Sequence, residues 1–142
     1  MCFDPFLVIG LATDALDAVR RRHWQQARLN PDPELTRLLK GARWALLKNP
    51  KNLTYRQAVT LARIRGMGGQ LIRAHQLKES LRGIFAGDLT DTKTVLRLLK
   101  QWLAWASRSK LPEFVTAART IGCHLDGITA AITRGMSNGR HE

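Results

Sequence analysis

Two pairs of aspartates are the first candidates for chemistry in this sequence, because each pair has helical spacing. Asp14 and Asp17 are three residues apart, as are Asp88 and Asp91, so each pair would share one face of a helix. Paired carboxylates can hold a divalent metal or carry out general acid–base chemistry. Near a helix start, however, such residues more often cap free amides and complement the helix dipole. We therefore expect structural roles for both pairs.

The remaining reactive side chains form no recognisable catalytic or metal-binding pattern. The four histidines are scattered, and none is paired with Cys, Asp or Glu at a known ligand spacing. Cys2 and Cys123 lie far apart, which argues against a disulfide framework and favours a reducing cytosol. The glycine-rich stretch 66–69 lacks the Lys-Ser/Thr of a phosphate-binding loop, so we interpret it as a hinge.

The tryptophans have two possible uses. Trp102 and Trp105 are three residues apart on an apolar face, which is typical of a packed core. Trp24 and Trp44 lie next to or close to arginines. They could stack on nucleobases, but packing at a seam between helices is the more common role for such residues.

The charge of the chain favours a polyanionic partner. The formal net charge is +12 and the pI is about 11.1. This excess points to nucleic acid first and to an anionic membrane second. The longest apolar run, residues 6–12, is too short to span a bilayer, and Asp4 occupies the place of a basic signal-peptide region. We expect a cytoplasmic protein with no membrane partner and no small-molecule substrate.

The elements that would position these residues are predicted to be helices. Hydrophobic residues make up 44% of the 142, enough for one domain with a packed core. No stretch alternates apolar and polar residues like a half-buried strand. Apolar residues instead recur at helical spacing in six segments, which cover approximately residues 5–28, 33–49, 54–66, 70–87, 91–106 and 112–135. The prediction is an all-α compact bundle of about six amphipathic helices, after a short extended piece at Cys2-Phe3.

Capping signals mark several of the helix ends. Asp32 precedes Pro33 as N-cap and first helical residue, and Thr54-x-x-Gln57 is a capping box. Thr90 or Asp91 is expected to cap the fifth helix, and Gly135 to end the sixth.

Four stretches taken together resemble a known family. In chain order they are Cys2-Phe3-Asp4-Pro5-Phe6 with residues 11–20; residues 42–50 with Asn52-Leu53-Thr54; residues 77–82; and Ser137-Asn138-Gly139-Arg140-His141-Glu142. Their order and spacing resemble bacterial insertion-sequence transposases of the DDE class, in the ISL-three subgroup, over nearly the whole chain.

The resemblance implies where this chain belongs in a larger enzyme. Such transposases have an RNase H-like α/β core whose two aspartates and one glutamate bind divalent metal, with a large helical insertion before the glutamate. Residues 1–6 would then be a remnant of the core, 7–136 the all-helical insertion, and 137–142 the return toward the core. The segments with the two catalytic aspartates have no counterpart in this sequence.

The resemblance also assigns candidate site residues. Glu142 falls on the third catalytic acid, and Asp4 falls on the acid of a D-x-F-H motif in which Leu7 replaces the histidine. Two-metal phosphoryl transfer needs several carboxylates around a pair of ions. We therefore expect an inactive isolated chain without a cofactor, and Mg²⁺ or Mn²⁺ held by Glu142 only in the complete enzyme.

DNA is the expected partner. The candidate contacts are Arg20, Arg21, Arg22, Arg43 and Lys48, although a run of arginines is also typical of a solvated helix face. Binding would associate the protein with the nucleoid. The chain could also assemble with itself or with a full-length transposase. The alternatives are a stand-alone basic helical nucleic-acid-binding or regulatory protein, a helical module that regulates a transposase, and, last, an independent nuclease.

Overall fold

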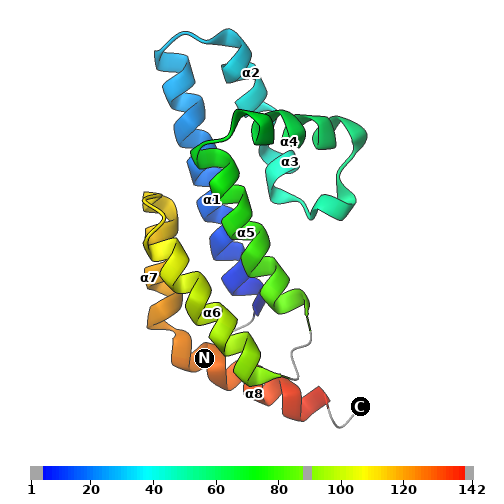
Figure 1. Ribbon diagram of the computed structural model, residues 1–142, viewed down its shortest axis with the longest axis vertical. Coiled ribbons are helices and arrows are strands. Elements are labelled where there is room, and N and C mark those ends of the chain that lie inside the picture. The colour runs from blue at the N-terminus through cyan, green and yellow to red at the C-terminus, as the bar shows by residue number, and fades with distance from the viewer. Residues whose placement is uncertain (1–4, 88–90, 140–142) are drawn as a thin grey trace. The chain divides into compact units, whose positions relative to one another are not determined.

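The computed structural model describes residues 5–87 and 91–139, and every regular element in these ranges is helical (Figure 1). This confirms the prediction of an all-α chain. The expected extended piece at residues 2–3 lies outside the described residues. The elements are α1 (Pro5–Leu29), α2 (Pro33–Lys40), α3 (Arg43–Leu47), η1 (Pro50–Asn52), α4 (Tyr55–Met67), α5 (Gln70–Ala86), α6 (Thr92–Ser107), α7 (Pro112–Cys123) and α8 (Leu125–Gly139).

Two of the six predicted helices are split, which gives eight α-helices in the described residues. The second breaks at Gly41, the C-cap of α2, because glycine is a poor helix former. The sixth breaks at His124, whose φ of −107° and ψ of 14° leave the helical region. Gly135 does not end α8, which continues to Gly139.

The predicted N-terminal caps of α2, α4 and α6 are present. Asp32 accepts a hydrogen bond from the Leu35 amide, and Asp91, not Thr90, caps α6 by accepting one from the Thr94 amide. Gly68 and Gly69 have φ of 69° and 85°, a left-handed conformation that separates α4 from α5. The helix break predicted at the glycine-rich stretch is therefore confirmed.

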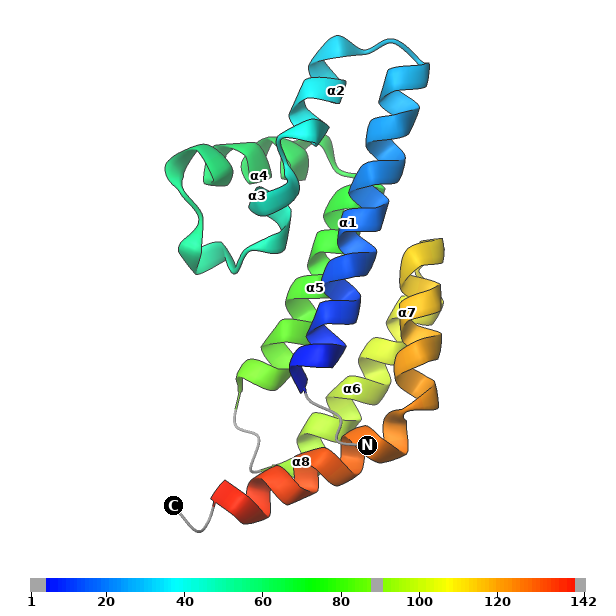
Figure 2. The same ribbon diagram turned by 180° about the vertical axis from the view of Figure 1, so that it is seen from behind.

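The chain divides into two units, Thr13–Gln76 and a two-segment unit of Met1–Ala12 with Leu77–Glu142. In the two-segment unit, α6 and α7 run side by side in opposite directions, and α8 packs across both (Figures 1 and 2). The Trp102 indole meets Phe114 edge-on, with ring centroids 6.5 Å apart. Trp102 Nε1 also donates a 2.8 Å hydrogen bond to the Leu77 carbonyl. Trp102 is core as predicted, whereas Trp105 is partly exposed.

In the Thr13–Gln76 unit, α3 and α4 pack against each other (Figure 2). Its buried side chains come from every α-helix of the unit and include Leu16, Val19, Leu39, Leu46, Leu61, Ile64 and Leu71. No helix among the described residues has both the length and the hydropathy needed to cross a membrane.

Candidate nucleic-acid interface

The two acids assigned by family resemblance, Asp4 and Glu142, lie outside the described residues, as does Asp88. Their catalytic roles stay predictions. Within residues 5–87 and 91–139, no group of three or more His, Cys, Asp and Glu side chains is placed to hold a metal ion.

Asp17 is the acid around which three arginines of the Thr13–Gln76 unit gather. One carboxylate oxygen lies 2.8 Å from Nε of Arg20. The other lies 3.5 Å from Nε of Arg21 and 4.0 Å from Nε of Arg43. Asp17 therefore acts as a shared counter-ion and has the structural role expected of it.

Arg20 belongs to the interior of its unit, and the expectation that it faces water is wrong. Its side chain is only 11% exposed. Besides the ion pair with Asp17, its Nη1 donates a 3.1 Å hydrogen bond to the carbonyl of Leu39. Leu39 is in the last turn of α2, where the helix dipole is negative, and its carbonyl also accepts a 3.3 Å hydrogen bond from the Ala42 amide. Arg20 thus acts as a C-terminal cap for α2.

The other four predicted DNA contacts each have an intramolecular partner but differ in exposure. Arg21 is 60% exposed despite its ion pair with Asp17. The Arg43 guanidinium lies 4.8 Å from the centroid of the half-exposed Trp44 ring. Arg22 and Lys48 donate hydrogen bonds to glutamine side chains, Gln70 at 3.1 Å and Gln57 at 3.2 Å. Arg21 and Arg43 are consequently the members of this set with the most solvent-accessible charge.

The distribution of acids along the chain indicates a basic surface more strongly than the run of three arginines does. Residues 35–78 contain ten Lys and Arg and no Asp or Glu. Within residues 13–76, thirteen Lys and Arg face only four Asp and Glu, so this unit carries +9 of the chain's formal +12. Counting acids in a moving window would have found this stretch from the sequence. A search for runs missed it because its basic residues are spaced apart.

Helix α4 presents much of this uncompensated charge. Only Leu61 and Ile64 among its thirteen residues are buried. Arg56 and Arg63 are exposed and seven residues apart, two helical turns, so they line one flank of the helix. Arg65 is exposed on the opposite flank. An outer ridge between the flanks carries the exposed side chains of Tyr55, Val59 and Ala62.

The start of α4 is fixed by a network of polar side chains. The Thr54 hydroxyl accepts a hydrogen bond from the Gln57 amide at 3.2 Å, and the Gln57 side chain accepts one from the Thr54 amide at 3.0 Å. The same Gln57 oxygen accepts from Lys48. This capping box holds the first turn of α4 in place and orients Tyr55 and Arg56.

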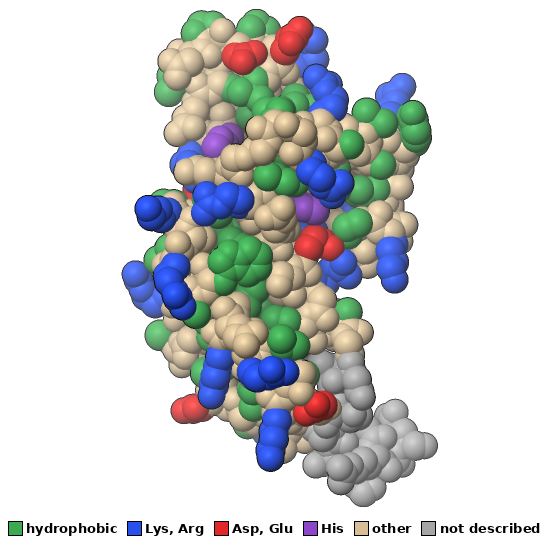
Figure 3. Space-filling view, in the orientation of Figure 1, with side chains coloured by type: hydrophobic (Ala, Val, Ile, Leu, Met, Phe, Trp, Pro, Cys, Tyr) green, Lys and Arg blue, Asp and Glu red, His purple; other side chains and the backbone are tan. Residues whose placement is uncertain are grey.

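Further cations lie on the elements next to α4. Arg37 of α2 and Arg63 of α4 line one surface groove, together with Thr60, Leu38, Gly41 and a single acid, Glu34. Lys40 at the end of α2 and Lys51 in η1 are also exposed. In the space-filling view, Lys and Arg side chains are distributed over the visible face and few acids lie between them (Figure 3).

Comparison with known proteins agrees with the family assigned from sequence motifs. The model of the ISL-three family of DDE transposases, described as "Transposase", matches residues 1–142. The chain is also 41% identical, over 157 aligned positions, to the transposase for insertion sequence element IS1557 of two Mycobacterium tuberculosis strains, CDC 1551/Oshkosh and H37Rv. No solved structure gives a significant match.

The chain belongs to this transposase family. The alignment covers 97% of the chain but 35% of each curated relative, so the chain spans about a third of their length and corresponds to part of a transposase.

Proposed function

We propose that this chain is the helical, DNA-contacting portion of a DDE transposase, with the outer surface of α4 as the main contact for duplex DNA. The observation that supports this most directly is the acid-free stretch 35–78, whose arginines flank a largely exposed helix. The family of the chain makes DNA the polyanion to expect. DNA would also bring the protein to the nucleoid.

The shape and chemistry of α4 suit a duplex. Thirteen residues make a helix about 20 Å long, and the major groove admits one α-helix. With the outer ridge in the groove, Arg56 and Arg63 on one flank and Arg65 on the other would face the phosphates of the two groove walls. Val59 and Ala62 on the ridge offer apolar contacts of the kind that thymine methyl groups make.

We further propose that the isolated chain does not cleave DNA. By family resemblance it holds one of the three catalytic acids, Glu142, with Asp4 at an auxiliary position. A single glutamate cannot position two divalent ions around the attacking and leaving oxygens. Mg²⁺ or Mn²⁺ would act in the complete enzyme. A nicking assay on supercoiled DNA with Mg²⁺ and with Mn²⁺ tests this, and cleavage that disappears in Glu142→Ala would contradict it.

The test of DNA binding is a salt titration of affinity for a short duplex. The variant Arg56→Gln/Arg63→Gln removes two charges from α4, and Arg119→Gln/Arg134→Gln removes two exposed charges from α7 and α8. Each lost phosphate contact should lower the slope of log affinity against log salt by about 0.9. We expect a decrease of about 1.8 for the α4 variant and less than half of this for the matched control. Equal slopes for the two variants would show that only net charge matters and would refute the proposal.

A further inference from the structure

A second basic surface lies on α6, in the two-segment unit. Residues 92–112 contain five Lys and Arg and no Asp or Glu. Three of the five, Lys93, Arg97 and Lys100, are spaced four and three residues apart and therefore share one face of the helix. All three are exposed. We call them the α6 stripe.

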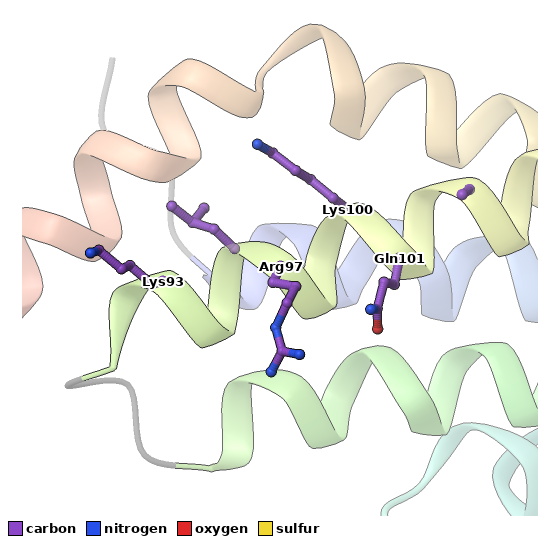
Figure 4. Close-up of a pocket in the computed structure, with 6 residues that line it drawn as sticks. Lys93, Arg97, Lys100 and Gln101 are labelled. Atoms are coloured by element: carbon purple, nitrogen blue, oxygen red, sulfur yellow. The ribbon is translucent and has the colours of Figure 1, made fainter.

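The α6 stripe borders a shallow hollow rather than a convex ridge. The lining residues are Lys93, Leu96, Arg97, Lys100, Gln101 and Ala104, all from α6. Figure 4 shows the side chains of Lys93 and Lys100 extending to one side of the helix in this view and those of Arg97 and Gln101 to the other. The short Ala104 and the half-buried Leu96 leave space between the charged groups.

The charges of the stripe have no partner among the residues that the structure describes. Lys93, Arg97 and Lys100 make no hydrogen bond or ion pair with the described part of the chain. The arginines around Asp17, by contrast, share a carboxylate. The stripe therefore offers three guanidinium or ammonium groups whose donors are all available to a ligand.

Burial of the opposite face of α6 keeps the stripe on the exposed side of the helix. Val95, Leu99, Trp102 and Ala106 are buried on that face. The hydrogen bond from Trp102 Nε1 to the Leu77 carbonyl prevents rotation of the helix about its axis without loss of a buried donor. Asp91 caps the first turn, next to Lys93. The three cations are thus presented from a rigid support.

We propose that the α6 stripe is a second binding surface for the phosphodiester backbone of DNA, separate from α4. It rests on the proposed DNA partner and adds a contact in the other unit. The helix rises about 10 Å from Lys93 to Lys100, a length over which one DNA strand presents about three phosphates along the duplex axis. An acidic partner protein would need apolar or aromatic anchors at the centre of its interface. The hollow beside the stripe has only the half-buried Leu96 and Ala104 as apolar lining, and the exposed Trp105 of α6 does not line it.

The test compares two triple variants of the full chain with the same net charge. One is Lys93→Gln/Arg97→Gln/Lys100→Gln; the matched control is Lys110→Gln/Arg119→Gln/Arg134→Gln, three exposed cations of the same unit that lie off the stripe. Far-UV circular dichroism confirms that both fold. In a salt titration with a 20-base-pair duplex, the stripe variant should lower the salt slope by about 2.7 and the control by less than 1.

Several results would overturn the inference. One is an unchanged slope in the stripe variant, and another is an equal decrease in both triples. A third is a stripe variant that loses binding to immobilised polyglutamate but keeps full affinity for the duplex, since this would indicate an acidic protein as the ligand. If the variant Lys93→Arg/Lys100→Arg keeps the salt slope of the unsubstituted chain, this would support a purely electrostatic contact with phosphate.

The same measurements separate this inference from the proposed role of α4. Combination of the stripe triple with Arg56→Gln/Arg63→Gln should give additive losses of binding free energy if the two surfaces act independently. A loss with the α4 variant alone would leave the proposed function standing and refute the stripe. A loss of binding with the stripe triple alone would support the stripe and refute the proposed role of α4.

Discussion

Arg20 and Arg21 are neighbours in sequence, yet their substitution by alanine should have opposite consequences. Arg20→Ala removes a side chain that is 11% exposed and makes two polar contacts, to Asp17 at 2.8 Å and to the Leu39 carbonyl at 3.1 Å. Arg21→Ala removes a side chain that is 60% exposed and has one ion pair, at 3.5 Å. We expect the first variant to lose stability and the second to lose DNA affinity.

The magnitude for Arg20→Ala follows from those two contacts. A hydrogen bond that involves a charged group contributes about 1.5–3 kcal/mol. Asp17 keeps Arg21 and Arg43 within 4.0 Å, so its carboxylate is not left without a counter-ion, and the lower end of the range applies to that contact. We expect a total loss of about 3 kcal/mol. The exposed ion pair of Arg21 should contribute less than about 1 kcal/mol.

The assay is urea unfolding followed by circular dichroism, combined with hydrogen exchange of the amides around the end of α2. Arg20→Ala should weaken protection at Leu39, Gly41 and Ala42, because the last turn of α2 loses its cap. Arg21→Ala is the matched control, since it removes the same charge from the adjacent position. Equal stability in the two variants, or unchanged protection in Arg20→Ala, would refute a capping role for Arg20.

Of three further predictions, two concern the supports of the two surfaces and one concerns Glu79 of α5, which pairs with Lys78 and Arg82. Thr54→Ala should destabilise the first turn of α4 by about 1 kcal/mol and increase hydrogen exchange there, whereas Thr116→Ala, in the middle of α7, serves as a control. Trp102→Phe keeps an aromatic ring, but the new ring is smaller than indole and lacks the Nε1 donor, so the hydrogen bond to the Leu77 carbonyl is lost. The unfolding free energy should fall by about 1–3 kcal/mol, and an unchanged urea midpoint would contradict this. Burial raises the pKa of Glu79, but hydrogen bonds from Arg82 and Lys78 outweigh that effect and lower it overall. A lowered folded-state pKa means that stability present above the ordinary value of 4.5 is lost as the pH falls through the folded-state pKa. Glu79→Gln should therefore be less stable at pH 7, and its unfolding free energy should fall less on acidification; parallel pH profiles would exclude this role.

Local signals in the sequence were sufficient to predict where most helices begin. Asp32-Pro33, Thr54-x-x-Gln57 and Asp91 each act within one turn, so no distant contact is needed to recognise them. The breaks at Gly41 and His124 were missed, because apolar periodicity continues through both positions and only the backbone conformation shows the interruption.

The burial of Arg20 could have been anticipated in part. It follows Leu16 by four residues, so it lies beside the apolar stripe of α1 and not opposite it. What the sequence could not show is the carbonyl of Leu39, nineteen residues away, that accepts the second hydrogen bond. The run of three arginines therefore suggested one surface, although successive residues of a helix point about 100° apart.

The placement of the acids explains why the excess charge of the Thr13–Gln76 unit belongs to its surface. Of the four acids, Asp17 is held among three arginines and Asp32 caps α2, so two of them stabilise the fold itself. The other two, Asp14 and Glu34, both precede the acid-free stretch 35–78. Helices α3 and α4 and the turn η1 themselves carry no acid; of their cations, Arg43 shares Asp17 at 4.0 Å and Arg63 lines a groove with Glu34. The cations of such a surface repel one another and attract a polyanion. This favours a role in binding over a role in stabilising the fold.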